Sequence, residues 1–149
     1  MDIQTIKAMF DACYQAKRIR DLLPALPKGV TPSYIHFLDT IESLEQQGTP
    51  VKVSDISDAL KLPRPGVTRT VKEMTAKGYL SKHTSANDGR ITYISITPAG
   101  RQLSQKYNTQ YFNHLAPLLG DISKEDADCM IQTIERFYRV MSERSIFVD

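Results

Sequence analysis

Between residues 53 and 97 the apolar residues change from a helical spacing to a strand spacing. Two segments with apolar residues three and four apart come first, and two alternating segments follow them. Asp88-Gly89 lies between the alternating segments and is typical of a tight hairpin turn, because glycine adopts a positive φ without steric cost. The pattern predicts two short helices and a hairpin, the order of a helix-turn-helix with a wing. The expected helices are about 54–60 and 64–77, and the expected strands are 79–84 and 91–97.

The second of these helices has two chemically different faces. Val67, Val71 and Met74 recur at helical spacing and are expected to be buried. A helix with a small and basic outer face fits the DNA major groove, where arginine can bond guanine O6 and N7 and lysine can contact phosphate. The alternative is an amphipathic helix whose polar face meets only solvent. The residues expected on the outer face are Arg64, Thr68, Arg69 and Lys72.

The positive charge of the chain is concentrated around this motif. Residues 52–101 carry nine Lys and Arg but four Asp and Glu, whereas residues 1–51 and 102–149 are each net negative. Basic surfaces attract polyanions, and Arg90 at the hairpin tip could reach a minor groove beside the helix. Without the preceding helices, the favoured interpretation of Arg90 would be an exposed turn residue with no binding role. The preceding helices, the local positive charge and Arg90 together favour a DNA-binding surface over one that meets only solvent.

The remaining sequence predicts four further helices. Proline after a potential N-cap marks two starts, at Thr31-Pro32 and Thr97-Pro98. Ser123 is expected to cap the last helix, and Ser54 to cap the first helix of the motif. Val51 and Val53 alternate in a very short strand-like stretch. The four helices are expected at about 2–23, 32–47, 98–118 and 124–144.

The order and spacing of these pieces resemble the MarR-type regulators, the multiple-antibiotic-resistance repressors, over essentially the whole length. The resemblance implies a mainly α fold with a winged helix-turn-helix lobe over 31–100. It also implies a helical dimerisation lobe formed by 1–30 and 101–149. The segments that carry it are Ser54–Leu60, Val67–Met74, Lys77–Leu80, Asp88–Arg90 and Ile96–Gly100.

The resemblance also implies roles for particular residues. Helix 64–77 would read the major groove, Arg90 would enter the minor groove, and Asp88 would orient the wing. Glycine has a low helix propensity, so Gly66 destabilises the expected helix by about 1 kcal/mol relative to alanine. The complete set of candidate DNA-binding residues is Ser54, Arg64, Thr68, Arg69, Thr70, Lys72, Asp88 and Arg90.

Partners follow from the same reading. Apolar stripes on both terminal helices, which one chain cannot cover, predict a homodimer. The resemblance implies a repressor of an inverted-repeat operator in double-stranded DNA, released by a small-molecule effector bound between the lobes. Aromatic stripes are also ordinary core, which is the competing interpretation of the effector candidates. Those candidates are Tyr34, Phe37, Leu38, Tyr107 and Tyr111.

Composition and motifs exclude several classes. The 149 residues suit one ordinary domain, and no apolar run approaches the roughly 20 residues of a membrane helix. No signal sequence is visible, so the expected location is cytoplasmic. No hydrolase, P-loop or dinucleotide motif is present, which predicts no catalytic residue, no enzyme and no cofactor. The three scattered histidines predict no metal site; they are His36, His83 and His114.

Two alternatives of function remain beside the main one. Some relatives sense oxidants through a cysteine, and Cys13 or Cys129 would serve here. Free cysteine is more often a small buried hydrophobe, and both lie on helices expected to be largely buried. A winged-helix module used only for protein contacts would instead show a neutral or acidic recognition helix, whereas this helix is basic.

Overall fold

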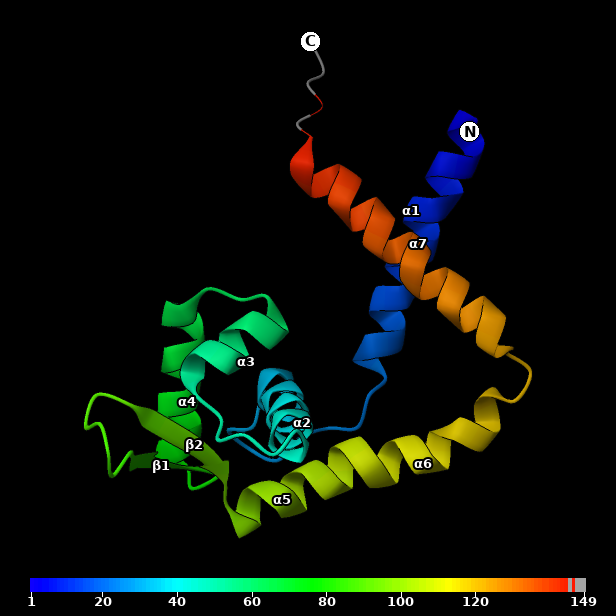
Figure 1. Ribbon diagram of the computed structural model, residues 1–149. Helices are drawn as coiled ribbons and strands as arrows, with labels where there is room; N and C mark the ends of the chain where they lie inside the picture. Colours follow the sequence, from blue (N-terminus) through cyan, green and yellow to red (C-terminus); the bar gives the residue numbers. More distant parts are fainter. Residues whose placement is uncertain (145, 147–149) are drawn as a thin grey trace. The chain divides into compact units, whose positions relative to one another are not determined.

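The computed structural model describes residues 1–144 and 146 (Figure 1). The chain divides into two compact units, Met1–Asn108 and Thr109–Asp149. The expected mainly helical fold with one hairpin is confirmed. The first unit contains α1 (Ile3–Asp21), α2 (Pro32–Gln46), α3 (Val53–Leu60), α4 (Arg64–Ala76), β1 (Leu80–Thr84), β2 (Thr92–Ile96) and α5 (Pro98–Ser104). The second contains α6 (Tyr111–Leu115) and α7 (Lys124–Glu143).

The core of the first unit lies between α2, α3, α4 and the inner face of the hairpin. Helix α2 contributes Tyr34, Phe37, Leu38 and Ile41, all of them buried. The stripe predicted for α4 is confirmed, since its three members have no exposed surface. Burial of such side chains stabilises the unit by about 1.5–3 kcal/mol each. The winged motif therefore has a core of its own.

The hairpin packs one face onto this core. Leu80 pairs with Ile96 in the antiparallel register, and Ile94 lies two residues before Ile96 on the same face. All three are buried. The predicted extended stretch before α3 is confirmed at Val51, which forms a bridge with Ile94 and accepts a hydrogen bond from its N–H at 2.8 Å. It is wrong at Val53, which is the first residue of α3.

Several predicted helix ends are confirmed. The Thr97 hydroxyl accepts from the Gly100 N–H at 3.1 Å, and the Ser123 hydroxyl accepts from the Asp126 N–H at 3.0 Å. Gly48 and Gly78 follow the ends of α2 and α4 with φ near +84° and +82°. That left-handed conformation ends a helix and favours glycine.

The start of α3 corrects the sequence-based prediction. Lys52 occupies the N-cap position, so Ser54 lies within the first turn and does not cap it. The carboxylate of Asp55 accepts the Lys52 N–H at 2.8 Å, which satisfies the helix start without a serine cap. Within α3, Ser57 is buried and Ala59 is exposed.

The helix predicted at 98–118 is not uniform. A π-helical stretch, Gln105–Gln110, separates α5 from α6, and a 3₁₀ turn, Ala116–Leu119, follows α6. The buried Ser104 hydroxyl donates to Glu42 Oε2 at 2.9 Å. The Asn108 side-chain amide donates to the Ser104 hydroxyl at 3.0 Å and to the Ile35 carbonyl at 3.2 Å. These bonds tie the start of the π-helical stretch to α2.

Neither α1 nor α7 buries a residue within this chain. Most apolar side chains of both helices remain exposed, among them Ile6, Phe10 and Ile134. The expected burial of Cys13 and Cys129 is wrong for the single chain, because these helices expose both thiols. Among residues 1–144 and 146, no helix is long and apolar enough to cross a bilayer.

Candidate nucleic-acid interface

The turn between α3 and α4 is fixed by a buried serine. Lys61 adopts a left-handed conformation with φ 53°, and the Leu62 N–H returns to the Ser57 carbonyl at 3.1 Å. The Ser57 hydroxyl in turn donates to the Leu62 carbonyl at 2.6 Å. Sequence reasoning missed Ser57, because no local pattern in the sequence indicates this contact. This closed turn sets the direction in which α4 leaves α3.

Helix α4 presents the two faces that its sequence predicts. Its apolar stripe is buried in the core, and Arg64, Thr68, Arg69 and Lys72 are all exposed. Thr70 is only half-exposed, and its hydroxyl donates to the Gly66 carbonyl at 3.1 Å within the helix. The structure therefore brings four of the predicted residues onto one open surface.

Ser54 lies apart from that surface. It is half-buried in the first turn of α3, at the start of the helix-turn-helix. Its position is that of a residue beside a helix N-terminus, which is a common place for phosphate contacts in DNA-binding proteins. A DNA contact through Ser54 stays a prediction.

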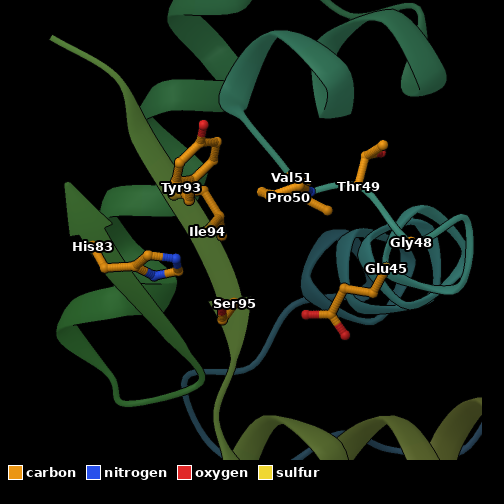
Figure 2. A pocket seen from close by; sticks show the side chains of 9 residues that line it. All are labelled: Glu45, Gly48, Thr49, Pro50, Val51, His83, Tyr93, Ile94 and Ser95. Atoms are coloured by element: carbon orange, nitrogen blue, oxygen red, sulfur yellow. The ribbon is translucent and has the colours of Figure 1, made fainter. Parts of the chain in front are cut away.

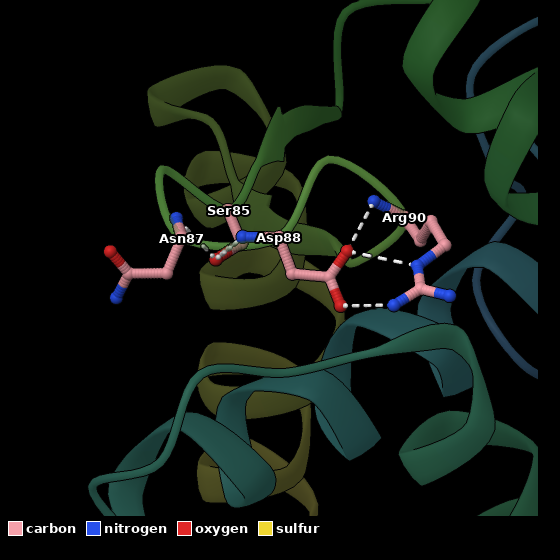
Figure 3. A network of polar contacts seen from close by, with 4 residues as sticks. All are labelled: Ser85, Asn87, Asp88 and Arg90. Atoms are coloured by element: carbon pink, nitrogen blue, oxygen red, sulfur yellow. Dashed lines mark hydrogen bonds and ion pairs between the residues drawn. The ribbon is translucent and has the colours of Figure 1, made fainter.

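The wing tip is organised around a carboxylate (Figure 3). Asp88 accepts hydrogen bonds from the Arg90 N–H at 3.0 Å, from its Nε at 3.2 Å and from a terminal nitrogen at 3.4 Å. These donors, the backbone N–H first and the side chain second, lower the pKa of Asp88. The Arg90 side chain is still 91% exposed. The pairing thus fixes where the guanidinium lies without hiding it.

Local contacts occupy most of the acidic groups in the basic region. Asp55 binds the N-cap N–H of α3, and Asp88 binds Arg90. Glu73 accepts a hydrogen bond from the Tyr34 hydroxyl at 3.1 Å. Bound carboxylates still carry charge, but each is held toward protein donors. Exposed arginine and lysine outnumber exposed acidic residues on α4 and the wing tip, where Glu73 is the exposed carboxylate.

A surface pocket of about 230 Å³ lies beside the hairpin, between β2 and the segment 48–51 (Figure 2). The rings of His83 and Tyr93 are 5.7 Å apart on the outward face of the strands. Glu45 lies at the other side of the pocket and binds Arg101 at 2.8 Å and the Ile96 N–H at 3.3 Å. These two bonds join the base of the wing to α2 and α5.

The candidate effector residues have different environments. Tyr34, Phe37 and Leu38 are buried members of the core of the first unit. Tyr107 is partly buried against that core, and its hydroxyl donates to the Ala25 carbonyl at 3.4 Å. Tyr111 belongs to the second unit, where its ring lies 5.2 Å from that of Phe112. A shared effector site stays a prediction.

Comparison with known proteins agrees with this geometry. The model of the MarR family matches residues 28–91, which run from the loop before α2 to the wing. The uncharacterized HTH-type transcriptional regulator YdgJ of Bacillus subtilis is 22% identical over 108 residues, 72% of this chain and 63% of that protein. The transcriptional repressor MprA of Escherichia coli is 26% identical over 105 residues, which are 70% of this chain and 58% of that protein. The chain therefore spans less than two thirds of either relative.

Solved structures extend the likeness to nearly the whole chain. Streptococcus pneumoniae FabT, solved in complex with DNA, has a TM-score of 0.67 at 19% identity and covers 95% of this chain and 99% of its own. Bordetella bronchiseptica BpsR, described for regulation of DNA binding by 6-hydroxynicotinic acid, has a TM-score of 0.63 at 13% identity. The match covers 90% of this chain and 98% of the BpsR chain. These likenesses confirm the winged-helix fold.

Proposed function

We propose that this chain is a transcriptional regulator of the MarR family that binds double-stranded DNA as a homodimer. The observation that carries the proposal is the open basic surface of α4 beside an arginine that a carboxylate positions at the wing tip. A regulator of this kind acts in the cytoplasm. We further propose that it represses its target, as the name of its relative MprA states for that protein.

The binding mode follows from the shapes of the two elements. An α-helix fits the major groove, so α4 would enter it with Arg69 directed at base edges and Lys72 at phosphate. The wing would follow the backbone to the neighbouring minor groove, where the negative potential attracts Arg90. The closed turn at Ser57 and the pairing at Asp88 hold both elements before DNA arrives, which reduces the ordering cost of binding.

The terminal helices would supply the dimer. Exposed apolar side chains on α1 and α7 need a cover, and a second copy of the chain provides one by symmetry. A two-fold dimer would place its recognition helices in successive major grooves, so the operator would be an inverted repeat.

Release by a small molecule is the regulatory part of the proposal. Its support is the name of BpsR, a structural neighbour described for control by an aromatic acid. We expect a mostly apolar ligand of this class to bind near Tyr107 or Tyr111. Thermal-shift screening of small aromatic acids tests this. Binding whose affinity is unchanged by Tyr107→Ala and Tyr111→Ala would remove these residues from the site.

Oxidant sensing is a second candidate, favoured by the exposure of Cys13 and Cys129. The two cysteines lie far apart in the sequence, on α1 and α7. We expect hydrogen peroxide to leave DNA binding unchanged in the wild type and in the Cys13→Ser/Cys129→Ser double variant. Release of the wild type alone by peroxide would favour the oxidant sensor.

The experiment that tests the main proposal uses randomised DNA. The wild-type chain is offered a pool of random duplexes, and the retained duplexes are sequenced. An enriched inverted repeat that binds more tightly than its scrambled version supports the regulator. Binding without enrichment, or no binding, favours a module that contacts proteins only. The enriched sequence is called the selected duplex below.

A further inference from the structure

The recognition helix is tied to α2 by polar contacts that the DNA-binding surface does not include. Tyr34 of α2 is 3% exposed, and its hydroxyl donates to Glu73 Oε2 at 3.1 Å across 39 residues of sequence. A buried phenol hydroxyl needs a partner, and a carboxylate is a stronger acceptor than a neutral group. The bond thus links the end of α4 that lies farthest from Arg64 to the core helix α2.

Lys77 adds a second tie at the same place. Its ammonium lies 5.1 Å from the centroid of the Tyr34 ring and donates to the Gly29 carbonyl in the loop before α2. A Cβ at Gly29 would lie 3.3 Å from the Lys77 nitrogen, and Gly29 has a φ of +81°. Glycine at this position therefore leaves room for the ammonium. Lys77 caps α4, four residues after Glu73.

These contacts differ in kind from the packing beneath α4. Val67, Val71 and Met74 hold the helix by apolar burial, which is not directional. The buried stripe decides which face of α4 turns inward, and the hydrogen bonds, which depend steeply on angle, restrict the remaining rotation of the helix about its own axis. That rotation decides where Arg69 and Lys72 point. The bond to Tyr34 also keeps the negative charge of Glu73 directed at protein, beside a surface that would meet phosphate.

We infer that Tyr34, Glu73 and Lys77, here called the α4 brace, are positioning residues that set base discrimination through α4 and not by contact with DNA. The inference rests on the proposed function. It predicts a particular signature: loss of the brace lowers affinity for the correct sequence and leaves the sequence-independent attraction to phosphate intact.

Tyr34→Phe is the central variant, because it removes only a hydroxyl. We expect affinity for the selected duplex to fall roughly tenfold, with affinity for the scrambled duplex and the salt dependence unchanged. Tyr93→Phe is the matched control, since it removes a hydroxyl from a wing tyrosine that packs on His83. Equal losses on both duplexes, or no loss on either, would overturn the inference.

Variants at Glu73 separate the hydrogen bond from the charge. Glu73→Gln keeps an acceptor for Tyr34, so the ratio of the two affinities should be retained even if both affinities rise. Glu73→Ala should lower that ratio as much as Tyr34→Phe does. The double variant Tyr34→Phe/Glu73→Ala should lower the ratio of the two affinities no more than either single change does, because each change breaks the same contact. Additive losses in the double variant would contradict a shared contact.

A measurement without DNA distinguishes failure of the brace from failure of the proposed function. Hydrogen exchange of the last amides of α4 should be faster in Tyr34→Phe than in Tyr93→Phe, at equal melting temperature of the two variants. If the wild type selects no duplex, the proposed function fails, and the exchange rates still report on the brace. Unchanged exchange in Tyr34→Phe would refute the brace itself.

Discussion

Arg69 and Arg90 are both exposed, but the chain holds them in different ways. Arg69 projects from the middle of α4, two residues from Val67 on one side and from Val71 on the other, and both valines are buried in the core. Arg90 projects from a turn, where Asp88 accepts bonds from its backbone and its side chain. A rigid helix suits the reading of one base edge, whereas a turn suits a groove whose width and potential vary. Replacement of the two arginines should therefore affect DNA binding in different ways.

Replacement of each arginine separates base reading from groove binding. Arg69→Ala should cost about 1–3 kcal/mol on the selected duplex and relax one position in each half-site. Arg90→Ala should weaken binding to selected and scrambled duplexes alike and flatten the salt dependence. Titrations at two salt concentrations measure both effects. The control is Arg136→Ala, an exposed arginine of α7. Equal losses on both duplexes for Arg69→Ala would show that the contacts are wrongly assigned.

The Asp88 carboxyl gives a test of the wing by titration. Its pKa lies below the ordinary value of 3.8 because the backbone and then the side chain of Arg90 donate to it. A lowered folded pKa means that this contact stabilises the fold above the unfolded pKa and is lost as pH falls through the folded one. Arg90→Ala keeps the N–H donor, so the pKa should rise only part of the way.

Carbon NMR of the side-chain carboxyl follows that titration. Asp2 serves as an internal control, because the backbone and side chain of Thr5 lower its pKa and Arg90 does not contact it. The Asp2 midpoint should stay constant. A return of Asp88 to its full ordinary value would mean that the backbone donor contributes nothing, contrary to the geometry.

Two glycines at the level of elements serve opposite purposes. Gly100 lies in the first turn of α5, where a Cβ would lie 2.2 Å from the Tyr79 carbonyl oxygen and 2.8 Å from Ile96 Cγ2. The hairpin can meet α5 this closely only because the side chain is absent. Gly66 lies in α4, and a Cβ there would meet nothing within 4 Å. Space, and not helix propensity, decides which glycine is required.

The same substitution should therefore have opposite effects at these two sites. Gly100→Ala should destabilise the chain by about 1–3 kcal/mol, because backbone must move to admit the methyl group. Gly66→Ala should stabilise it by up to about 1 kcal/mol through helix propensity. Urea unfolding of the two variants beside the wild type measures both changes. Equal stability of Gly100→Ala and the wild type would mean that α5 can shift without cost.

The whole molecule is incomplete as a single chain in one respect. Its winged motif has a buried core, whereas α1 and α7 leave most of their apolar side chains exposed. Monomeric proteins rarely expose such extended apolar surface, so association is the expected remedy. The functional unit would then be larger than the chain, and DNA affinity would depend on protein concentration.

Sedimentation should show a dimer at micromolar concentration. Ile134→Asp should shift it toward monomer, because a charge would be buried in the interface. Arg136→Asp on the opposite side of α7 is the control and should leave the dimer intact. The monomeric variant should lose binding to the inverted repeat, whose half-sites we expect about 10 base pairs apart. A wild-type monomer at that concentration would refute the dimer.

The sequence by itself determined the elements, because the signals for them are local. Apolar spacing located α2, α4 and the hairpin, and glycine or a hydroxyl residue marked several helix ends. The same spacing separated the buried face of α4 from its exposed face, which carries Arg64, Thr68, Arg69 and Lys72. The further candidate Thr70 is only half-exposed. Where a local signal misled, at Ser54, a neighbouring carboxylate supplied the cap instead.

The tertiary structure alone decided how those elements hold one another. Tyr34 meets Glu73, Lys77 meets Gly29 and Gly100 meets Tyr79 across 21 to 48 residues of sequence. No periodicity records such pairs, since each depends on where the core places two distant segments. The π-helical stretch that contains Asn108 escaped prediction for the same reason, since Asn108 finds its partner at Ile35 of α2. Ser57 bonds Leu62 only five residues away, but a polar side chain reveals its role only once its partner lies beside it.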